Sequence, residues 1–410
     1  MEVKPGYKLT EVGVIPEDWR VSTLGKTCAF ENGDRGKNYP SGASFAPNGV
    51  PFVNAGHLTE GRIRLSELNY ISKESFDRLG SGKLMPGDIL FCLRGSLGKF
   101  GVVGPDLCEG AIASSLIIVR PKSASVGREY LSCYFRSDHC AQMIDKWSGG
   151  AAQPNLGAQD LARFTIPLPP TKAEQEAIAE ALSDAEALIE SLEQLLVKKR
   201  HLKQGAMQEL LTGKKRLPGF AISTGYNQTR VGVIPEDWEV ANLAAVCSMK
   251  SGDGITSASI DPFSKYPCYG GNGLRGFTTR FTHDGRYALI GRVGALCGNV
   301  LGVEGKFFAS EHAIVVTASA RTAIGWLTVV LGEMRLNQYS ESSAQPVLTV
   351  SKLLKLDVAC PPTKDEEEAI AAILSDMDAE IAGLEGKLAK ARHLKQGMMQ
   401  ELLTGRIRLI

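Results

Sequence analysis

The chain has 410 residues, of which 43% are hydrophobic and 22% are charged, with a formal net charge of +1 at pH 7. This composition is typical of a globular protein with two or three cores, and the charge balance alone does not indicate a nucleic-acid binder. No apolar run approaches the roughly 20 residues of a membrane span, and the N-terminal MEVKPGYKLT lacks the apolar segment of a signal peptide. We therefore expect a cytoplasmic protein that does not associate with a membrane.

The first block, residues 1–166, is predicted to be a mixed domain of helices and strands. It contains the octapeptide VGVIPEDW at residues 12–19. Strand-like apolar runs cover 88–93 and 114–121, a helical pattern covers 128–147, and Asn-Gly pairs signal tight turns. The block is long enough to form a core of its own.

The second segment, residues 167–217, is predicted to be one long helix of roughly 60 Å. Prolines are tolerated only at a helix start, and Thr171 and Glu174 have the spacing of a capping box. Apolar residues from Ile178 to Leu196 step alternately by four and three, which is the seam of a coiled coil. Two arrangements remain open: packing on a second such helix, or packing on the helix's own domain.

The second half of the chain repeats the first. VGVIPEDW recurs unchanged at 231–238, and 32 of the 48 residues at 170–217 recur at 362–409. Residues 218–359 therefore form a second block and residues 360–410 a second helix. The fold class that we expect is α+β (mixed α/β), with two similar globular domains joined by two long antiparallel coiled-coil helices in a pseudo-two-fold arrangement.

The two blocks also resemble each other weakly. Strand-like runs in the second block cover 287–291 and 312–318, and a helical pattern covers 321–339. The alignment matches LFCLRGSLGKFGVV with ALIGRVGALCGNVL, so that Arg94 is aligned with Arg292. It also matches AAQPNL with SAQPVL. We infer a common fold whose surfaces have diverged.

These motifs together resemble the specificity subunit of a Type I restriction-modification system. They are GVIPEDW before each block, AQP near each block's end, PLPP or CPP opening each helix, and HLKQGAMQELLTG or HLKQGMMQELLTG closing it. The resemblance spans almost the whole chain. It implies that each block is a target-recognition domain reading one half of an asymmetric, bipartite site in double-stranded DNA.

The resemblance also implies partners and cofactors. The two helices would set the spacer between half-sites and dock two methyltransferase subunits, and restriction/translocase subunits would join to form the nuclease. This chain would hold no cofactor, while the partner subunits would use S-adenosylmethionine, ATP and Mg.

Candidate DNA contacts are polar and basic residues on glycine-rich loops and at strand ends, where an arginine can pair with guanine in the major groove. They are Arg35, Lys37, Asn54, His57, Arg94, Ser96 and Lys99 in the first block, and Asn272, Arg275, Arg280, Arg292 and His312 in the second. The stretch from Lys265 to Lys306 is locally basic, which suits phosphate contact. Trp19 and Trp238 are expected to pack at the base of each block.

Motifs for catalysis are missing. GNGLRG at 271–276 matches GxGxxG without the required strand and helix, and the chain has neither a P-loop nor an Asn-Pro-Pro-aromatic motif. The nine cysteines are expected to be reduced, and Cys133, His139 and Cys140 fit no common zinc spacing. We expect a chain that is not itself an enzyme; the alternative is a coiled-coil scaffold protein that does not bind DNA.

Overall fold

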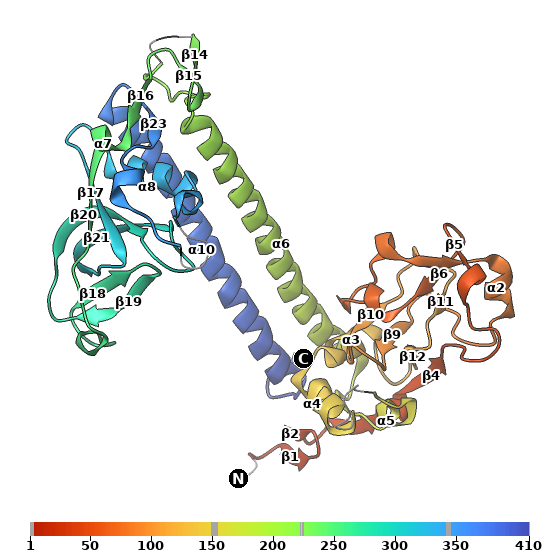
Figure 1. Cartoon of the computed structure of the whole chain (residues 1–410). Coiled ribbons are helices and arrows are strands. Elements are labelled where there is room, and N and C mark those ends of the chain that lie inside the picture. The colour runs from red at the N-terminus through yellow and green to blue at the C-terminus, as the bar shows by residue number, and fades with distance from the viewer. Residues whose placement is uncertain (1–3, 149–154, 222, 224, 342–345, 410) are drawn as a thin grey trace. The chain divides into compact units, whose positions relative to one another are not determined.

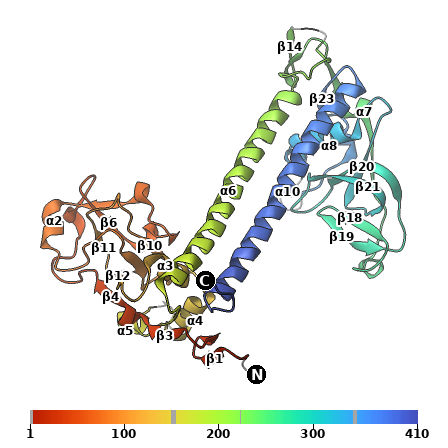
Figure 2. The same cartoon turned by 180° about the vertical axis from the view of Figure 1, so that it is seen from behind.

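The computed structural model describes residues 4–148, 155–221, 223, 225–341 and 346–409. It divides into unit 1, which comprises Met1–Leu192 and Lys387–Ile410, and unit 2, which comprises Glu193–Gly386. Each unit holds one globular domain with stretches of helices α6 (Lys172–Leu210) and α10 (Lys364–Leu402) (Figures 1 and 2). In the part described, no helix is both long and apolar enough to cross a lipid bilayer.

Unit 1 is built around two main sheets. The five-stranded sheet has the order β4 (Cys28–Asn32), β12 (Leu116–Pro121), β9 (Ile89–Cys92), β10 (Phe100–Val102) and β7 (Glu60–Gly61). The four-stranded sheet has the order β11 (Ala111–Ile112), β6 (Val50–Val53), β8 (Asn69–Ile71) and β5 (Phe45–Ala46). The two-stranded pairs are β1 (Tyr7–Thr10) with β2 (Gly13–Pro16), and β3 (Arg20–Thr23) with β13 (Thr165–Leu168). The shorter helices are α1 (Leu24–Thr27), α2 (Lys73–Arg78), α3 (Arg128–Phe135), α4 (Asp138–Trp147) and α5 (Ala158–Ala162).

Unit 2 has one large sheet. Its order is β17 (Cys247–Ser251), β22 (Ala313–Ala318), β20 (His283–Gly291), β21 (Val300–Ala309), β18 (Tyr266–Gly270) and β19 (Gly273–Thr278). The two-stranded pairs are β14 (Tyr226–Thr229) with β15 (Gly232–Pro235), and β16 (Glu239–Asn242) with β23 (Asp357–Cys360). The shorter helices are α7 (Leu243–Val246), α8 (Ile324–Glu333) and α9 (Val350–Leu353).

The two domains share a framework, as the weak sequence similarity predicted. Strands β4, β12, β9 and β10 follow one another in the same order as β17, β22, β20 and β21. A parallel pair completes each framework, with Phe52 opposite Ala111 in unit 1 and Cys268 opposite Phe308 in unit 2. Strand β9 and residues Leu116–Val119 of β12 are apolar because both of their faces are buried.

The long helices run antiparallel within each unit. In unit 1, Glu186 of α6 pairs with Lys395 of α10, and in unit 2 Lys203 lies 2.5 Å from Asp378. Both proposed packing modes occur together. Ile178 of α6 belongs to the core of its own domain, and that core also includes Leu402 from the far end of α10.

The repeated octapeptide forms a socket for the end of a long helix. Trp19 and Trp238 are 0% and 5% exposed, as expected for residues at the base of each domain. Gly405 ends α10 at a φ of +68°, and a Cβ there would lie 2.7 Å from the ring of Pro16. Gly213 has the same φ after α6 and meets Pro235 in the same way. Each octapeptide therefore holds the end of the helix from the other repeat.

An arginine completes each socket. Arg408 pairs with Asp18 at 3.0 Å and with Glu174, and Arg216 pairs with Asp237 at 2.7 Å and with Glu366 at 2.6 Å. Only the threonine half of each predicted capping box is present. Thr171 and Thr363 accept hydrogen bonds from the backbone N–H groups of Glu174 and Glu366, but these two carboxylates bind the arginines.

Candidate nucleic-acid interface

Three loops of unit 1 converge on residues 113–115, which connect β11 to β12. The Ala113 N–H donates to the Val53 carbonyl at 2.8 Å, and the Leu93 N–H donates to the Ser115 carbonyl at 2.9 Å. Arg35 follows β4 and donates from Nη2 to the Ser114 carbonyl at 3.2 Å. We call the loops that follow β4, β6 and β9, with residues 113–115, the first loop cluster.

Unit 2 repeats this arrangement around residues 310–312, which connect β21 to β22. The Ser310 N–H donates to the Tyr269 carbonyl at 2.8 Å, and the Arg292 N–H donates to the His312 carbonyl at 2.9 Å. Gly252, which follows β17, leaves no room for a Cβ beside the carbonyls of Ala309 and Ser310. The loops that follow β17, β18 and β20, with residues 310–312, form the second loop cluster.

The first loop cluster brings together most of the candidates that the sequence suggested in its domain. Arg94 is exposed and donates from Nε to Asn155 Oδ1 at 3.2 Å. Ser96 and Lys99 are exposed on the same loop, and Lys37 is exposed on the loop after β4. Their contact with DNA stays a prediction, because the structure shows only that they are close and accessible.

Asn54 and His57 have a structural role that the sequence did not reveal. Asn54 Oδ1 accepts from the Gly56 N–H at 2.8 Å, and the Asn54 N–H donates to His57 Nδ1 at 3.1 Å. His57 is only 6% exposed, and this burial lowers its pKa. These hydrogen bonds fix the path of the loop after β6, which is what presents the neighbouring cluster residues.

In the second loop cluster, Asn272, Arg292 and His312 lie on adjoining loops. A Cβ at Gly271 would lie 2.9 Å from the Val293 carbonyl oxygen and 3.1 Å from that of His312, so the three backbones touch. Arg275 lies beside Gly270 at the start of the same hairpin. Arg280 lies elsewhere, with its guanidinium 5.0 Å from the centre of the Phe308 ring.

The expected correspondence of Arg94 with Arg292 is wrong by one residue. Arg94 forms a β-bridge with Asn155, and the residue that bridges the equivalent position 347 is Val293. The carbonyl of Arg292 accepts from the Leu348 N–H, as the carbonyl of Leu93 accepts from Leu156. Side chains alternate along an extended chain, so the two arginines point to opposite sides of their equivalent loops.

Two acidic residues, Asp34 and Glu311, accept hydrogen bonds that hold the loops of these clusters in place. Asp34 accepts the backbone N–H groups of Gly36 and Gly80, both at 2.9 Å, and these hydrogen bonds lower its pKa. Glu311 accepts the Ile255 N–H at 3.3 Å and lies 3.3 Å from His312 Nε2.

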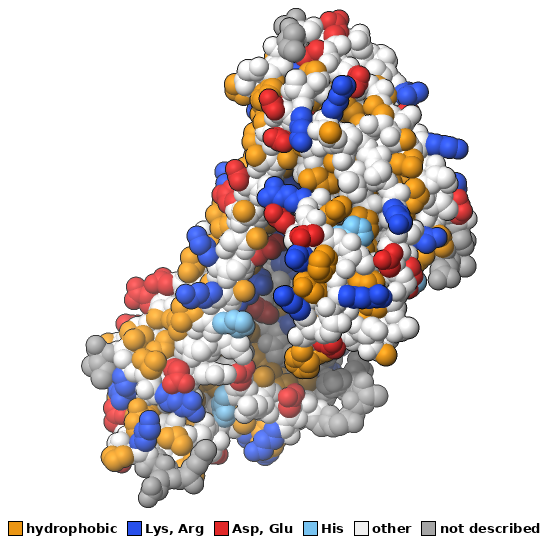
Figure 3. Space-filling model, turned by 90° about the vertical axis from the view of Figure 1, so that its left-hand side faces the viewer, with side chains coloured by type: hydrophobic (Ala, Val, Ile, Leu, Met, Phe, Trp, Pro, Cys, Tyr) orange, Lys and Arg blue, Asp and Glu red, His pale blue; other side chains and the backbone are white. Residues whose placement is uncertain are grey.

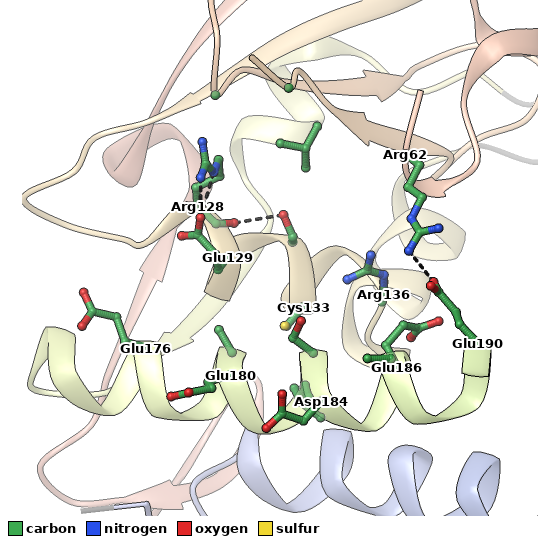
Figure 4. A pocket seen from close by; sticks show the side chains of 18 of the residues that line it. Arg62, Arg128, Glu129, Cys133, Arg136, Glu176, Glu180, Asp184, Glu186 and Glu190 are labelled. Atoms are coloured by element: carbon green, nitrogen blue, oxygen red, sulfur yellow. Dashed lines mark hydrogen bonds and ion pairs between the residues drawn. The ribbon is translucent and has the colours of Figure 1, made fainter. Parts of the chain in front are cut away.

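A groove of about 970 Å³ separates α3 from α6 in unit 1 (Figure 4). Arg128, Glu129 and Cys133 of α3 line it together with Arg136, which follows α3, and a row of carboxylates lines it from α6. The α6 carboxylates are Glu176, Glu180, Asp184, Glu186 and Glu190. In unit 2 a groove of about 660 Å³ occupies the equivalent place between the start of α8 and α10.

The described residues show no arrangement for metal chemistry. They contain no group of three or more His, Cys, Asp or Glu side chains that could hold an ion. All nine cysteines are free, and burial raises the pKa of Cys28 to about 11 and that of Cys140 to about 12, so these thiols stay protonated.

The AQP motifs lie outside the described residues, except for Pro346, whose carbonyl accepts from the Gly294 N–H at 3.2 Å.

Comparison with known proteins places this architecture in a family. The family model for the Type I restriction modification DNA specificity domain matches residues 16–198 and 235–392, which is most of the chain. The chain therefore belongs to the specificity subunits of Type I restriction-modification systems.

Curated relatives match over part of their length. The chain is 43% identical over 140 residues to the EcoprrI specificity subunit of Escherichia coli, covering 33% of this chain and 35% of that protein. It is 28% identical over 246 residues to the MjaX specificity subunit of Methanocaldococcus jannaschii, described as putative, covering 58% and 54%. The chain thus spans about a third to a half of these relatives.

Solved structures match over nearly the whole chain. The specificity subunit from M. genitalium superposes with a TM-score of 0.64 at 15% identity, covering 98% of both chains. A chain from a study of the assembly and conformational transition of a Type I system superposes with a TM-score of 0.56 at 18% identity, covering 96% of this chain and 99% of that chain. These likenesses establish the shared fold.

Proposed function

We propose that this chain recognises an asymmetric, bipartite sequence in double-stranded DNA, with the first loop cluster reading one half-site and the second reading the other. One observation carries the proposal: two copies of the same backbone framework present different side chains at equivalent positions, such as Arg94 and Val293. Base edges in the major groove are distinguished by side-chain chemistry, so unlike clusters read unlike half-sites.

The helices set the spacer between half-sites in this proposal. Two half-sites on one face of DNA are separated by about one helical turn, roughly 34 to 36 Å. Helices α6 and α10 have 39 residues each, which corresponds to about 58 Å of helix. A helix pair is stiff enough to keep a fixed spacing.

The same helices carry a surface suited to two copies of one partner, the methyltransferase subunit. Leu202 and Leu394 are equivalent in the repeat, and they are 51% and 59% exposed. Packing within the chain does not explain an identical, exposed leucine in both copies, whereas a shared partner does. The equivalent grooves beside α6 and α10 offer further contact area in each unit.

Catalysis belongs to the partners in this proposal. Methyl transfer with S-adenosylmethionine would come from the methyltransferase subunits, and cleavage driven by ATP and Mg from restriction/translocase subunits. This chain would supply no catalytic residue and bind no cofactor.

Two measurements test the proposal. Sequencing the methylated bases of cells that express the chain with its methyltransferase should give one motif of two unlike halves with a fixed spacer. A mobility-shift assay with the purified complex should retard that motif selectively. Absence of sequence-specific retardation with every partner would favour a scaffold protein that does not bind DNA.

The docking surface has its own test. Leu202→Asp and Leu394→Asp should each remove one methyltransferase copy from the complex, measured by native mass spectrometry. Leu188→Asp is the matched control, because Leu188 is 53% exposed on α6 but its equivalent residue is Glu380. Unchanged stoichiometry in both variants would refute this surface.

A further inference from the structure

Unit 2 presents an aromatic ring to solvent beside its large sheet. Phe263 is 93% exposed, the largest fraction among the exposed large hydrophobic residues of the described chain. It precedes β18 and follows a single turn of 3-10 helix at Ser257–Ser259. In unit 1, Phe45 of β5 is 43% exposed, but its ring packs edge-to-face on Phe52 at 5.9 Å.

The loop that carries Phe263 is held in one conformation. Asp261 Oδ1 accepts the N–H groups of Phe263 at 2.7 Å and Ser264 at 2.6 Å, and its Oδ2 accepts the Ser264 hydroxyl at 2.5 Å. The backbone of Asp261 exchanges two hydrogen bonds with Phe277 of β19, at 2.9 and 2.7 Å. These hydrogen bonds hold the turn that carries the Phe263 ring in one conformation.

Cations and aromatic rings continue from this turn over the neighbouring strands. Lys265 lies 5.3 Å from the centre of the Tyr266 ring, Tyr266 meets Phe281 edge-on at 5.0 Å, and Lys306 lies 4.9 Å from the Phe281 ring. Among the described residues, Lys265 and Arg280 form no ion pair with a carboxylate. Figure 3 views unit 2 from the side of its large sheet, where Lys and Arg side chains lie among hydrophobic and acidic ones.

These observations fit one ligand, a duplex nucleic acid. Unneutralised cations suit phosphates, and an apolar ring on a rigid turn suits insertion between base pairs, which partly unstacks and bends DNA. We infer that Phe263 is a wedge that enters a base-pair step in or beside the half-site read by unit 2, while Lys265 and Arg280 hold the flanking phosphates. The inference rests on the proposed DNA-binding function and adds a readout of DNA deformability in one half only.

The test uses the full chain in complex with its methyltransferase and the DNA motif found by methylation sequencing. 2-Aminopurine, whose fluorescence rises when it is unstacked, is placed at each position of the two half-sites in turn. The wild-type complex should raise fluorescence several-fold at one step of the half-site read by unit 2. Phe263→Ala should abolish that rise and weaken binding about tenfold, Phe263→Trp should keep both, and Phe45→Ala should change neither.

The outcomes separate this inference from the function on which it rests. A methyltransferase extrudes its target base, so the signal at the methylated adenine should persist in Phe263→Ala and show that the complex is active. Specific binding with no step unstacked apart from the methylated adenine, and with Phe263→Ala equal to wild type, would overturn the wedge but leave DNA recognition intact. Loss of methyltransferase binding in Phe263→Ala without any change in DNA unstacking would assign the ring to a protein contact and also overturn it.

Discussion

At the scale of single residues, the repeat contains a natural comparison between an amide and a carboxyl group. Gln175 Oε1 accepts the Gly127 N–H at 2.8 Å, and the equivalent Glu367 accepts the Ala323 N–H at 2.6 Å. Both side chains are 3% exposed. Burial raises the pKa of Glu367 to about 7, because a charged carboxylate is poorly solvated there.

Glu367→Gln should therefore stabilise the protein in a pH-dependent way. The folded pKa is raised, so the stability that protonated Glu367 contributes is present below its unfolded pKa of about 4.5 and is lost as the pH rises through 7. We expect little change at pH 5 and a gain of up to about 3 kcal/mol in unfolding free energy at pH 8. Urea unfolding at both pH values measures this, and Gln175→Glu should show the opposite sign; an equal effect at both pH values would contradict the explanation.

The two socket arginines, Arg216 and Arg408, differ in burial and so should differ in how much they contribute to the free energy of unfolding. Arg216, Asp237 and Glu366 have side chains that are 8%, 11% and 1% exposed, whereas Asp18 beside Arg408 is 52% exposed. Arg216→Ala leaves two buried carboxylates and should cost about 3 to 5 kcal/mol. Arg408→Ala leaves one buried carboxylate, Glu174, while water solvates Asp18, so it should cost less, about 2 to 3 kcal/mol.

Hydrogen exchange localises these two effects. Backbone amides in peptides of unit 2 should exchange hydrogen faster in Arg216→Ala than in the wild type. Those in peptides of unit 1 should exchange faster in Arg408→Ala. Arg286→Ala is the control, because its ion pair with Glu304 is about 70% exposed and should contribute little. Equal acceleration of both units by either variant would show that the sockets do not stabilise their units separately.

At the scale of elements, the sequence predicted the long helices and the central strands, because these depend on local patterns of residues. The 3.5-residue seam and the capping threonines anticipated α6 and α10, and the apolar runs anticipated β9, β12, β20 and β22. The socket was not foreseen, because it joins Trp19 to Gly405 across nearly the whole chain and no local signal encodes that pairing. The register of Arg94 was missed for a similar reason: an alignment of two weakly similar loops cannot position a one-residue gap.

The seam makes a quantitative prediction about the spacer. A seven-residue insertion in each helix, near Gln194 and near the equivalent Gly386, preserves the heptad pattern and lengthens the pair by about 10 Å. The preferred spacer should then grow by about three base pairs, measured from the methylated motif. A four-residue insertion near Gln194 alone shifts the ion pairs out of register and should alter or abolish the preference; an unchanged spacer in both variants would contradict a helical ruler.

At the scale of the whole molecule, each loop cluster is built from the strands of its own unit. Exchanging residues 20–166 for those of a related protein, while keeping the octapeptide at 12–19, should therefore change one half of the methylated motif and leave the other half intact. Keeping the octapeptide preserves the socket for α10. Methylation sequencing reads both halves at once, and a change in both would contradict independent reading.

The packing of Trp19 against the end of α10 has a consequence for biosynthesis. Unit 2 is continuous in sequence, so all of its residues are made before residue 387 is added. Unit 1 begins first but needs Leu402, Leu403 and Arg408 to close its core, and these are made after the whole of unit 2. The unit made first is thus completed after the other, and a chain truncated before Leu402 would contain all of unit 2 but an incomplete unit 1 core.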